Sequence, residues 1–352
     1  MQTEEHSAPA EDSLTEKPSA PEHPVPDSPS ADNIIPARKA YSGAQLNLAL
    51  FYLFYIFVAM IIEHFLPESR SKAAEYLAHY IPMYLIAFPL YLLISKPLET
   101  AKPEQHKMTV PQLFKAFCVC EFVGVTGNLL GMIVNFFLSL IMKKSTSSTM
   151  LVDGIFGEST LLFLFLAIIC APFVEEMLFR KILIDRVRKY GNGIAILISG
   201  LLFGLFHGNF TQVFYASLLG MLFAFIYIRT GKIQYTIALH MSVNFWGTAM
   251  PFLALRNVDV KELLNSINSM DVDKITAALP DLKYLLIVVV VTYTLAFAGL
   301  ILFILHRKEL KVDRAIAPLP KGKRFVTSCC NIGCLAMMVV CAVRFLQQLG
   351  II

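Results

Sequence analysis

The chain has 352 residues, of which 56% are hydrophobic and only 16% are charged, with a formal net charge of +4. A soluble domain is closer to a quarter charged, and the apolar residues here are gathered into long runs, so the composition excludes an ordinary soluble protein. The basic residues are scattered over short connections, which argues against a nucleic-acid-binding surface.

Residues 1–42 differ from the rest of the chain because they are rich in Pro, Glu, Ser and Ala. Residues 1–40 contain eight acidic and three basic side chains, and no apolar stretch there could form the core of a signal peptide. So little apolar surface cannot offset the loss of chain entropy on folding. The sequence therefore predicts a disordered tail over residues 1–42.

Residues 43–348 carry apolar runs long enough to cross a bilayer, which takes about 20 residues as a helix. Only a helix satisfies its own backbone hydrogen bonds in lipid. The runs predict an all-α, polytopic transmembrane helix bundle with eight or nine spans. The predicted spans are 44–66, 74–95, 113–142, 160–180, 193–207, 211–229, 233–252, 284–305 and 325–346.

Two of these spans are irregular. The third, 113–142, is long and could be tilted or broken near Gly124, Gly127 and Gly131. The fifth, 193–207, is short and could fail to cross fully.

The lysines and arginines between the spans predict the orientation of the chain. With the N-terminus in the cytoplasm, the inner connections carry 19 basic residues and the outer connections carry eight. Because basic residues concentrate on the cytoplasmic side, we expect a multi-pass protein of the cell membrane with a cytoplasmic N-terminus. Eight spans would place the C-terminus inside, and nine would place it outside. The C-terminal residues carry no ER-retention signal, which favours a prokaryotic membrane.

The connection 253–283 is the one long loop of the predicted bundle. Its apolar residues recur at near-helical spacing among polar ones. They are Leu263, Leu264, Ile267, Met270, Ile275 and Leu279. Two interpretations stay open: an amphipathic helix that lies at the membrane interface, or an ordinary helix packed on the bundle.

Ionisable residues inside spans are costly and therefore suggest function. Glu175 and Glu176 are adjacent near the end of the span 160–180, and they diverge by about 100° around a helix. Glu176 precedes Arg180 by four residues, the favourable order for an ion pair, which leaves Glu175 free. Pro172, just upstream, removes a helix hydrogen bond to Ile168 and favours a kink. The alternative is that both acids only pair with arginines at the membrane surface.

Two histidines lie within later spans. His207 follows Phe203 by four residues, and a single histidine at a helix end is more often structural than catalytic. His240 and Asn244 are four residues apart, so they share one helix face and could hold a developing oxyanion. The alternative for this pair is a polar clamp between helices.

The turn signals allow these groups to meet. Two residues face each other in an antiparallel helix pair when the turn lies at their mean position. The mean of 175 and 207 is 191, where Tyr190-Gly191-Asn192-Gly193 is a strong turn signal. A second turn at Gly231 could bring His240 to a similar depth. However, the basic cluster 180–189 places Glu175 near the inner face, whereas His207 ends its own span, and the sequence leaves this conflict open.

Together these residues resemble the three motifs of a known family. Glu-Glu-x-x-x-Arg at 175–180, Phe-x-x-x-His at 203–207 and His-x-x-x-Asn at 240–244 are similar to the motifs of the CPBP intramembrane proteases, also called Abi. The family includes CAAX prenyl endopeptidases and bacteriocin-processing or immunity proteins. The resemblance covers about residues 115–250, the protease-like core, and no motif residue departs from the pattern.

The resemblance implies a membrane protease that acts on a membrane-anchored or prenylated protein or peptide. It implies that Glu175, aided by His207, activates a water as general base, and that His240 and Asn244 stabilise the oxyanion. Glu176 and Arg180 would support the site. The family is commonly labelled a metalloprotease, and Glu175, His207 and His240 could ligate zinc. No His-Glu-x-x-His motif occurs, and a water activated by Glu and His needs no metal, so we favour the metal-free mechanism.

Two other function classes stay open. The fold could act as a non-catalytic membrane scaffold in bacteriocin self-immunity or regulation. A transporter could use buried Glu and His residues as a proton relay, although no internal repeat is evident. The substrate is equally open, because a prenylated CAAX tail, a bacteriocin leader and a membrane-anchored regulator all fit the motifs.

Overall fold

The computed structural model describes residues 28–67, 70–96, 98–143, 155, 159–312 and 315–351. Within these residues every regular element is helical and no strand occurs, which confirms the predicted all-α class. In the described residues, six helices are long and apolar enough to cross a membrane, or seven when the pair Lys321–Cys329 and Ile332–Gln348, bent by 56°, counts as one span. The protein is therefore a polytopic membrane protein.

Several long helices contain widened π-helical or tight 3-10 turns. In chain order the first elements are η1 (Ala31–Asn33), α1 (Ile34–Phe65), α2 (Lys72–Ile81), η2 (Pro82–Ala87), α3 (Phe88–Ser95), α4 (Val110–Met142), α6 (Thr160–Phe165), η3 (Leu166–Cys170), α7 (Ala171–Glu176), η4 (Met177–Ile184), α8 (Asp185–Val187) and η5 (Arg188–Tyr190). They are followed by α9 (Asn192–Phe206), α10 (Val213–Thr230), α11 (Ile233–Asn244), η6 (Phe245–Ala249), α12 (Met250–Leu255), α13 (Val260–Asn268), α14 (Val272–Ala278), η7 (Leu279–Leu282), α15 (Lys283–His306), η8 (Arg307–Glu309), η9 (Lys321–Lys323), α16 (Arg324–Cys329) and α17 (Ile332–Gln348).

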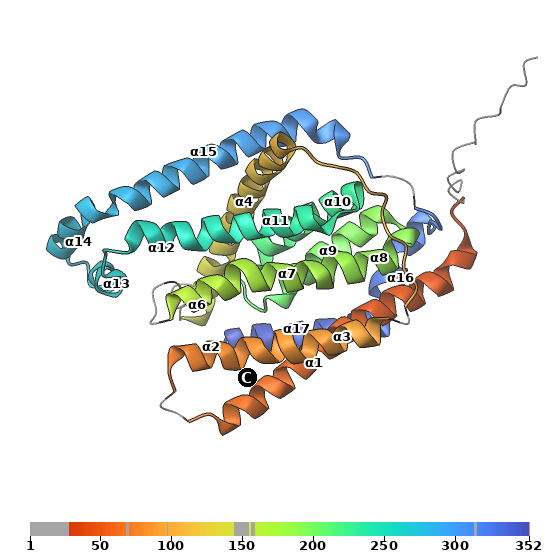
Figure 1. Ribbon diagram of the computed structural model, residues 1–352, viewed down its shortest axis with the longest axis horizontal. Helices are drawn as coiled ribbons and strands as arrows, with labels where there is room; N and C mark the ends of the chain where they lie inside the picture. The colour runs from red at the N-terminus through yellow and green to blue at the C-terminus, as the bar shows by residue number, and fades with distance from the viewer. Residues whose placement is uncertain are drawn as a thin grey trace, which may run out of the picture.

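The helices are arranged around the segment that carries the motifs. Figure 1 shows α15 on one side, α1, α2, α3 and α17 on the opposite side, and the elements from α6 to α11 between them, with α4 running across from α15 past α11. Helix α9 packs along α10, α4 packs on both α15 and α10, and α1 packs on α17. The motif residues therefore lie on central helices that are covered from both sides.

The first helix begins earlier than the sequence predicts. Helix α1 starts at Ile34, ten residues before the predicted start at 44 and inside the segment 1–42 that we expected to be disordered. Ala37 and Tyr41 are fully buried there, so tertiary packing supplies the apolar burial that the composition of this segment does not suggest. Residues 1–27 lie outside the described residues.

The glycines of α4 are packing sites rather than breaks. Helix α4 runs uninterrupted from Val110 to Met142, so the predicted break near Gly124, Gly127 and Gly131 does not occur. A Cβ on Gly127 would collide with the backbone of Tyr215 on α10. Small residues let membrane helices approach closely, and this is the role of the glycine here.

The span that carries Glu175 is longer than predicted. A continuous helix extends from Thr160 to Tyr190, and it does not end near Arg180. The prediction failed because the basic cluster was assumed to lie outside the bundle. Instead Arg180 is fully buried, and the guanidinium of Arg186 donates to the carbonyl oxygens of Ile182 and Ser95.

This longer helix removes the reason for placing Glu175 near the inner face, which had conflicted with the position of His207. Helix α9 has 15 residues, or about 22 Å, which is shorter than the hydrocarbon core of a bilayer. It pairs with the preceding helix around the predicted turn at Gly191, as the bond from Ser199 Oγ to the carbonyl of Phe179 (2.9 Å) shows. Glu175 and His207 therefore lie on helices that pair with each other around this turn.

The predicted span 233–252 corresponds to the continuous helical stretch α11, η6 and α12. In the described part of the chain, this stretch is not among the helices that are long and apolar enough to cross a membrane. Its polar residues, among them Gln234, His240 and Asn244, lower its mean hydropathy. His240 and Asn244 are also the residues of one of the motifs.

The connection 253–283 forms two short helices, α13 and α14, instead of one. The carboxylate of Asp271 accepts a hydrogen bond from the backbone N–H of Lys274 and so caps a new helix at this position. Several apolar side chains of this region stay exposed, including Met270 (82%) and Val272 (69%). Whether they rest on a membrane surface stays a prediction.

Candidate active site

A fully buried ion pair forms the floor of the candidate site. Glu176 on α7 and Arg180 on η4 are one helical turn apart, and Arg180 Nε lies 3.1 Å from Glu176 Oε2. Neither side chain has any exposed surface. The predicted pairing therefore exists inside the bundle and not at the membrane surface. Removal of one partner of such a pair would leave an uncompensated buried charge.

Arg180 is held by an aromatic and a backbone contact as well. Its guanidinium carbon lies 4.4 Å from the ring centroid of Phe203 on α9, within the range of a cation–π interaction. Its Nη2 also donates to the carbonyl oxygen of Gly220 on α10, at 3.4 Å. Arg180 thus ties α9 and α10 to the helix that carries the two glutamates.

His240 on α11 lies between the two carboxylates. Its Nδ1 is 3.0 Å from Glu176 Oε1, and its Nε2 is 3.6 Å from Glu175 Oε2. Because an ionised carboxylate only accepts, Nδ1 is the protonated nitrogen that donates to Glu176. A neutral His240 then presents a lone pair at Nε2, and it can donate from this atom only when the ring is doubly protonated.

His207 is the C-cap residue of α9, and its tautomer is also determined by its partner. Its Nδ1 lies 2.8 Å from the carbonyl oxygen of Phe203, which can only accept a hydrogen bond. Nδ1 is therefore protonated, and Nε2 of the neutral ring carries a lone pair. His207 is half-buried, unlike Glu176 and Arg180. A water could reach this nitrogen more easily than the buried pair.

Asn244 forms a polar clamp between two helices, which is one of the two interpretations that the sequence left open for the pair His240 and Asn244. Its Nδ2 donates to the carbonyl oxygen of Ala167 at 2.8 Å. In the π-helical turn η3, the N–H of Ala171 bonds to the carbonyl of Leu166, so the next bond in this register would join residue 172 to Ala167. Residue 172 is proline and has no N–H to donate. Asn244 satisfies the carbonyl that Pro172 leaves free, and one amide hydrogen remains for another acceptor.

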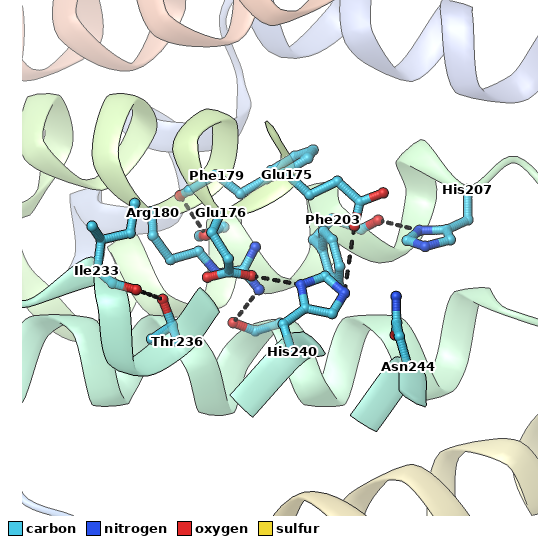
Figure 2. A network of polar contacts seen from close by, with 12 residues as sticks. Glu175, Glu176, Phe179, Arg180, Phe203, His207, Ile233, Thr236, His240 and Asn244 are labelled. Atoms are coloured by element: carbon cyan, nitrogen blue, oxygen red, sulfur yellow. Dashed lines mark hydrogen bonds and ion pairs between the residues drawn. The ribbon is translucent and has the colours of Figure 1, made fainter. Parts of the chain in front are cut away.

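Figure 2 shows these side chains together: Glu175 from α7, His207 at the end of α9, and His240 and Asn244 from α11 gather on one side of the buried ion pair. The ring of Phe203 lies between the two histidines, with centroids 5.0 Å from His207 and 5.6 Å from His240. Glu175 is 9% exposed, so its carboxylate is partly screened from solvent. The three motifs therefore converge, although no direct bond joins Glu175 to His207 in the described structure.

Comparison with known proteins bears on the same segment. Residues 157–246, which include every motif residue, match the family described as Type II CAAX prenyl endopeptidase Rce1-like. A putative membrane peptidase, YdiL of Bacillus subtilis (strain 168), is 26% identical over 173 residues, covering 48% of this chain and 68% of YdiL. The membrane-embedded CAAX protease MroQ of Staphylococcus aureus (strain USA300) is 24% identical over 245 residues, covering 64% of this chain and 95% of MroQ. Residues 157–246 therefore match the CPBP family. No solved structure is significantly similar to the chain.

Among the described residues, the candidate side chains do not form an assembled metal site. Zinc requires three protein ligands at about 2.0–2.3 Å in a catalytic site. Among the described residues no group of three His, Cys, Asp or Glu side chains is arranged to hold a metal ion. The Nδ1 atoms of His240 and His207 bond to Glu176 and to a carbonyl oxygen, which leaves both Nε2 lone pairs available, as in metal-ligating histidines. The donor types therefore suit a metal, but Glu175, His207 and His240 are not arranged around one point in the described structure. The steps below are derived from the protein side chains and water.

Two ionisable residues outside the core 115–250 belong to no motif but also lie within predicted spans. His79 and Arg344 are ionisable residues within the predicted spans 74–95 and 325–346. The structure places Tyr84, on η2, within electrostatic range of Glu175. The rule that drew attention to Glu175, an ionisable side chain in an apolar run, applies equally to His79 and Arg344.

Proposed function

We propose that this protein is an intramembrane endopeptidase that hydrolyses a peptide bond of a membrane-associated substrate with a water activated by Glu175 and His207. One observation carries the proposal. Glu175 and the two histidines lie on three helices around one region, and both ring tautomers are determined by their partners. Similarity to a membrane CAAX protease and a membrane peptidase supports the reaction class.

Glu175 would act as the general base. A carboxylate takes a proton from a water that attacks the substrate carbonyl, and the same carboxyl then gives this proton to the leaving amine. Nε2 of His207 has the lone pair needed to accept a second hydrogen bond from the water. Together the two groups would orient the water and remove its proton.

His240 and Asn244 would stabilise the tetrahedral intermediate. Asn244 retains one amide hydrogen after its bond to Ala167, so it can donate to an oxyanion. His240 can donate from Nε2 in its doubly protonated form. Donors that are already in place cost no reorganisation in the transition state, and this is the usual source of their catalytic effect.

Glu176 and Arg180 would be positioning residues. Glu176 binds Nδ1 of His240, and Arg180 binds Glu176, so the pair determines the orientation of the imidazole. Such supporting contacts hold a catalytic group to within the small tolerance that its reaction requires.

The substrate would be a membrane-anchored or prenylated protein or peptide that reaches the site from the bilayer. The protein would work in the cell membrane, with its N-terminus in the cytoplasm. The relatives are named as a membrane peptidase and a CAAX protease, and the matching family as a CAAX prenyl endopeptidase, which motivates a prenylated peptide as the first candidate substrate.

The test compares protein termini in membranes of cells that carry either the wild-type protein or Glu175→Gln at matched levels. Glutamine preserves the shape of the side chain but cannot accept the proton of a water. We expect new termini only with the wild type, since loss of a general base typically slows a reaction by about 10²–10⁴-fold. The sequences at these termini would identify the substrate.

Glu121→Gln is the matched control, because Glu121 is a buried carboxyl on α4 outside the three motifs. This control should produce the same termini as the wild type. Identical termini in cells with wild type and with Glu175→Gln would contradict the proposal. A physiological phenotype that persists in Glu175→Gln without any cleavage would favour the scaffold function instead.

A further inference from the structure

An open groove of about 420 Å³ lies between the end of α12 and the start of α15, and none of the motif residues lines it. Its lining changes from apolar to polar along its length. The apolar part contains Leu253, Ile287 and Val288, and the polar part contains Arg256, Asn257, Asp281 and Tyr284. The polar residues lie where the two helices end or begin, so the groove is polar at the helix ends and apolar along the helices.

The two walls of the groove are held together below the lining residues. Nε1 of Trp246 on η6 donates to Oγ1 of Thr292 on α15 at 2.8 Å. Trp246 precedes Met250 by four residues, and Thr292 follows Val288 by four, so this bond lies about one helical turn deeper than the groove. The packing of α12 on α15 therefore determines the separation of the walls.

Arg256 and Asp281 contribute opposite charges from the two walls. Among the described residues, neither side chain forms an ion pair or a hydrogen bond, with the other or with a third group. Asn257, at the same end of the groove, also has no hydrogen-bond partner in this part of the chain. A cation and an anion that line one groove without meeting leave room for a ligand that carries both charges.

The apolar part of the groove lies on a surface that faces lipid. The span Val272–Glu309 is only 11% buried over its most apolar stretch, and Ile287 is 57% exposed. An apolar surface of this kind on a membrane-spanning helix contacts acyl chains. Tyr284 lies at the start of α15, and tyrosines concentrate at the depth of lipid headgroups. The groove therefore runs from headgroup depth into the acyl-chain region.

We infer that this groove binds one molecule of phosphatidylethanolamine. Arg256 binds the phosphate, and the carboxylate of Asp281 accepts a hydrogen bond from the ammonium group, both of which are charge-assisted contacts. One acyl chain lies along Leu253 and Ile287. Phosphatidylcholine has no N–H to donate to Asp281, and phosphatidylglycerol has no cation to place beside it, so the charges of the groove favour a lipid with an ammonium headgroup.

The bound lipid also stabilises the helix that carries one of the motifs. Helix α12 continues directly from α11 and η6, and α11 contains His240 and Asn244. A ligand that binds only the folded protein raises its melting temperature. This inference does not depend on the proposed function, because it concerns a site outside the three motifs.

The test is a titration of the delipidated full-length protein in detergent micelles with three lipids of identical acyl chains, followed by native mass spectrometry. The wild type should bind phosphatidylethanolamine about fivefold more tightly than phosphatidylcholine or phosphatidylglycerol, the effect of about one net hydrogen bond. Asp281→Ala should abolish this preference. Arg256→Gln should weaken the binding of phosphatidylethanolamine and phosphatidylcholine by a similar factor, because both lipids carry the phosphate.

Asp273→Asn and Arg307→Gln change exposed charges outside the groove and should behave as the wild type. The melting temperature of each lipid-free variant shows that it is folded. Equal binding of phosphatidylethanolamine and phosphatidylcholine by the wild type would overturn the inference, and so would a preference that survives in Asp281→Ala or unchanged binding in Arg256→Gln. Tighter binding of phosphatidylglycerol would also overturn it, since Arg256 and Lys283 would then attract any anionic lipid.

Discussion

At the scale of single residues, the site depends on a charged pair that water does not reach. Glu176 and Arg180 are both fully buried, and desolvation offsets much of their attraction. The pair therefore contributes more to the positions of its neighbours than to the net stability of the protein. Glu176 fixes one nitrogen of His240, and Arg180 links three helices through Glu176, Phe203 and Gly220.

Substitution of one partner tests this role. Glu176→Leu should lower the free energy of unfolding by about 3–5 kcal/mol, because Arg180 would remain buried without a counter-charge. The measurement is reversible unfolding of the purified protein in mixed micelles. Glu262→Gln breaks the exposed ion pair with Lys274 and should change stability very little, since solvent screens that pair. Equal effects of the two substitutions would contradict the argument.

At the scale of elements, the helix Thr160–Tyr190 changes its hydrogen-bond register just before the two glutamates. The π-helical turn η3 widens the helix upstream of Pro172, and the carbonyl of Ala167 is left to the side chain of Asn244. π-helical turns inside α-helices are frequent at functional sites, where they re-aim side chains. Here the turn couples the helix of Glu175 to the helix of His240.

A double-mutant cycle between Pro172 and Asn244 measures that coupling. Asn244→Leu alone should destabilise the protein, because it removes a partner from the carbonyl of Ala167. In the Pro172→Ala background the backbone can supply an N–H, so the same substitution should cost less, with a coupling of about 0.6 kcal/mol, typical of membrane helices. Unfolding free energies of the four proteins give the value. Strictly additive effects would show that Pro172 and Asn244 act independently.

At the scale of the whole molecule, the bundle places the motif helices between two outer groups. Helix α15 lies on one side, with α4 running across from it past α11, and α1, α2, α3 and α17 lie on the other side (Figure 1). The short helices α13 and α14 project apolar side chains away from this bundle, which is consistent with contact with a membrane surface.

Tryptophan quenching tests the location of α14. The chain has one tryptophan, Trp246, which Trp246→Phe would remove. In this background, emission from Val272→Trp should be quenched by lipids brominated near the headgroup. Emission from Asp273→Trp, about 100° further around the helix, should be quenched much less. Equal quenching at both positions, or none, would mean that α14 does not lie at the interface as an amphipathic helix.

The helical class and the membership of the candidate site were accessible from the sequence because both depend on local pattern. Apolar runs require helices in lipid, and a few ionisable groups inside such runs stand out. The turn at Gly191 sits midway between Glu175 and His207, so their pairing across the turn could be worked out by counting residues. The ion pair between Glu176 and Arg180 follows from four-residue spacing.

Other features were decided only by contacts between helices that are distant in the sequence. The helix of Glu175 continues to Tyr190 because Arg180 and Arg186 find partners inside the bundle, which no count of charges reveals. Asn244 acts as a clamp because a proline 72 positions earlier frees a carbonyl on a facing helix. Arg344 reaches the turn at Gly208 because α17 folds back on the bundle. The local pattern of apolar residues shows which face of a helix is buried, but it does not show against which other helix that face packs.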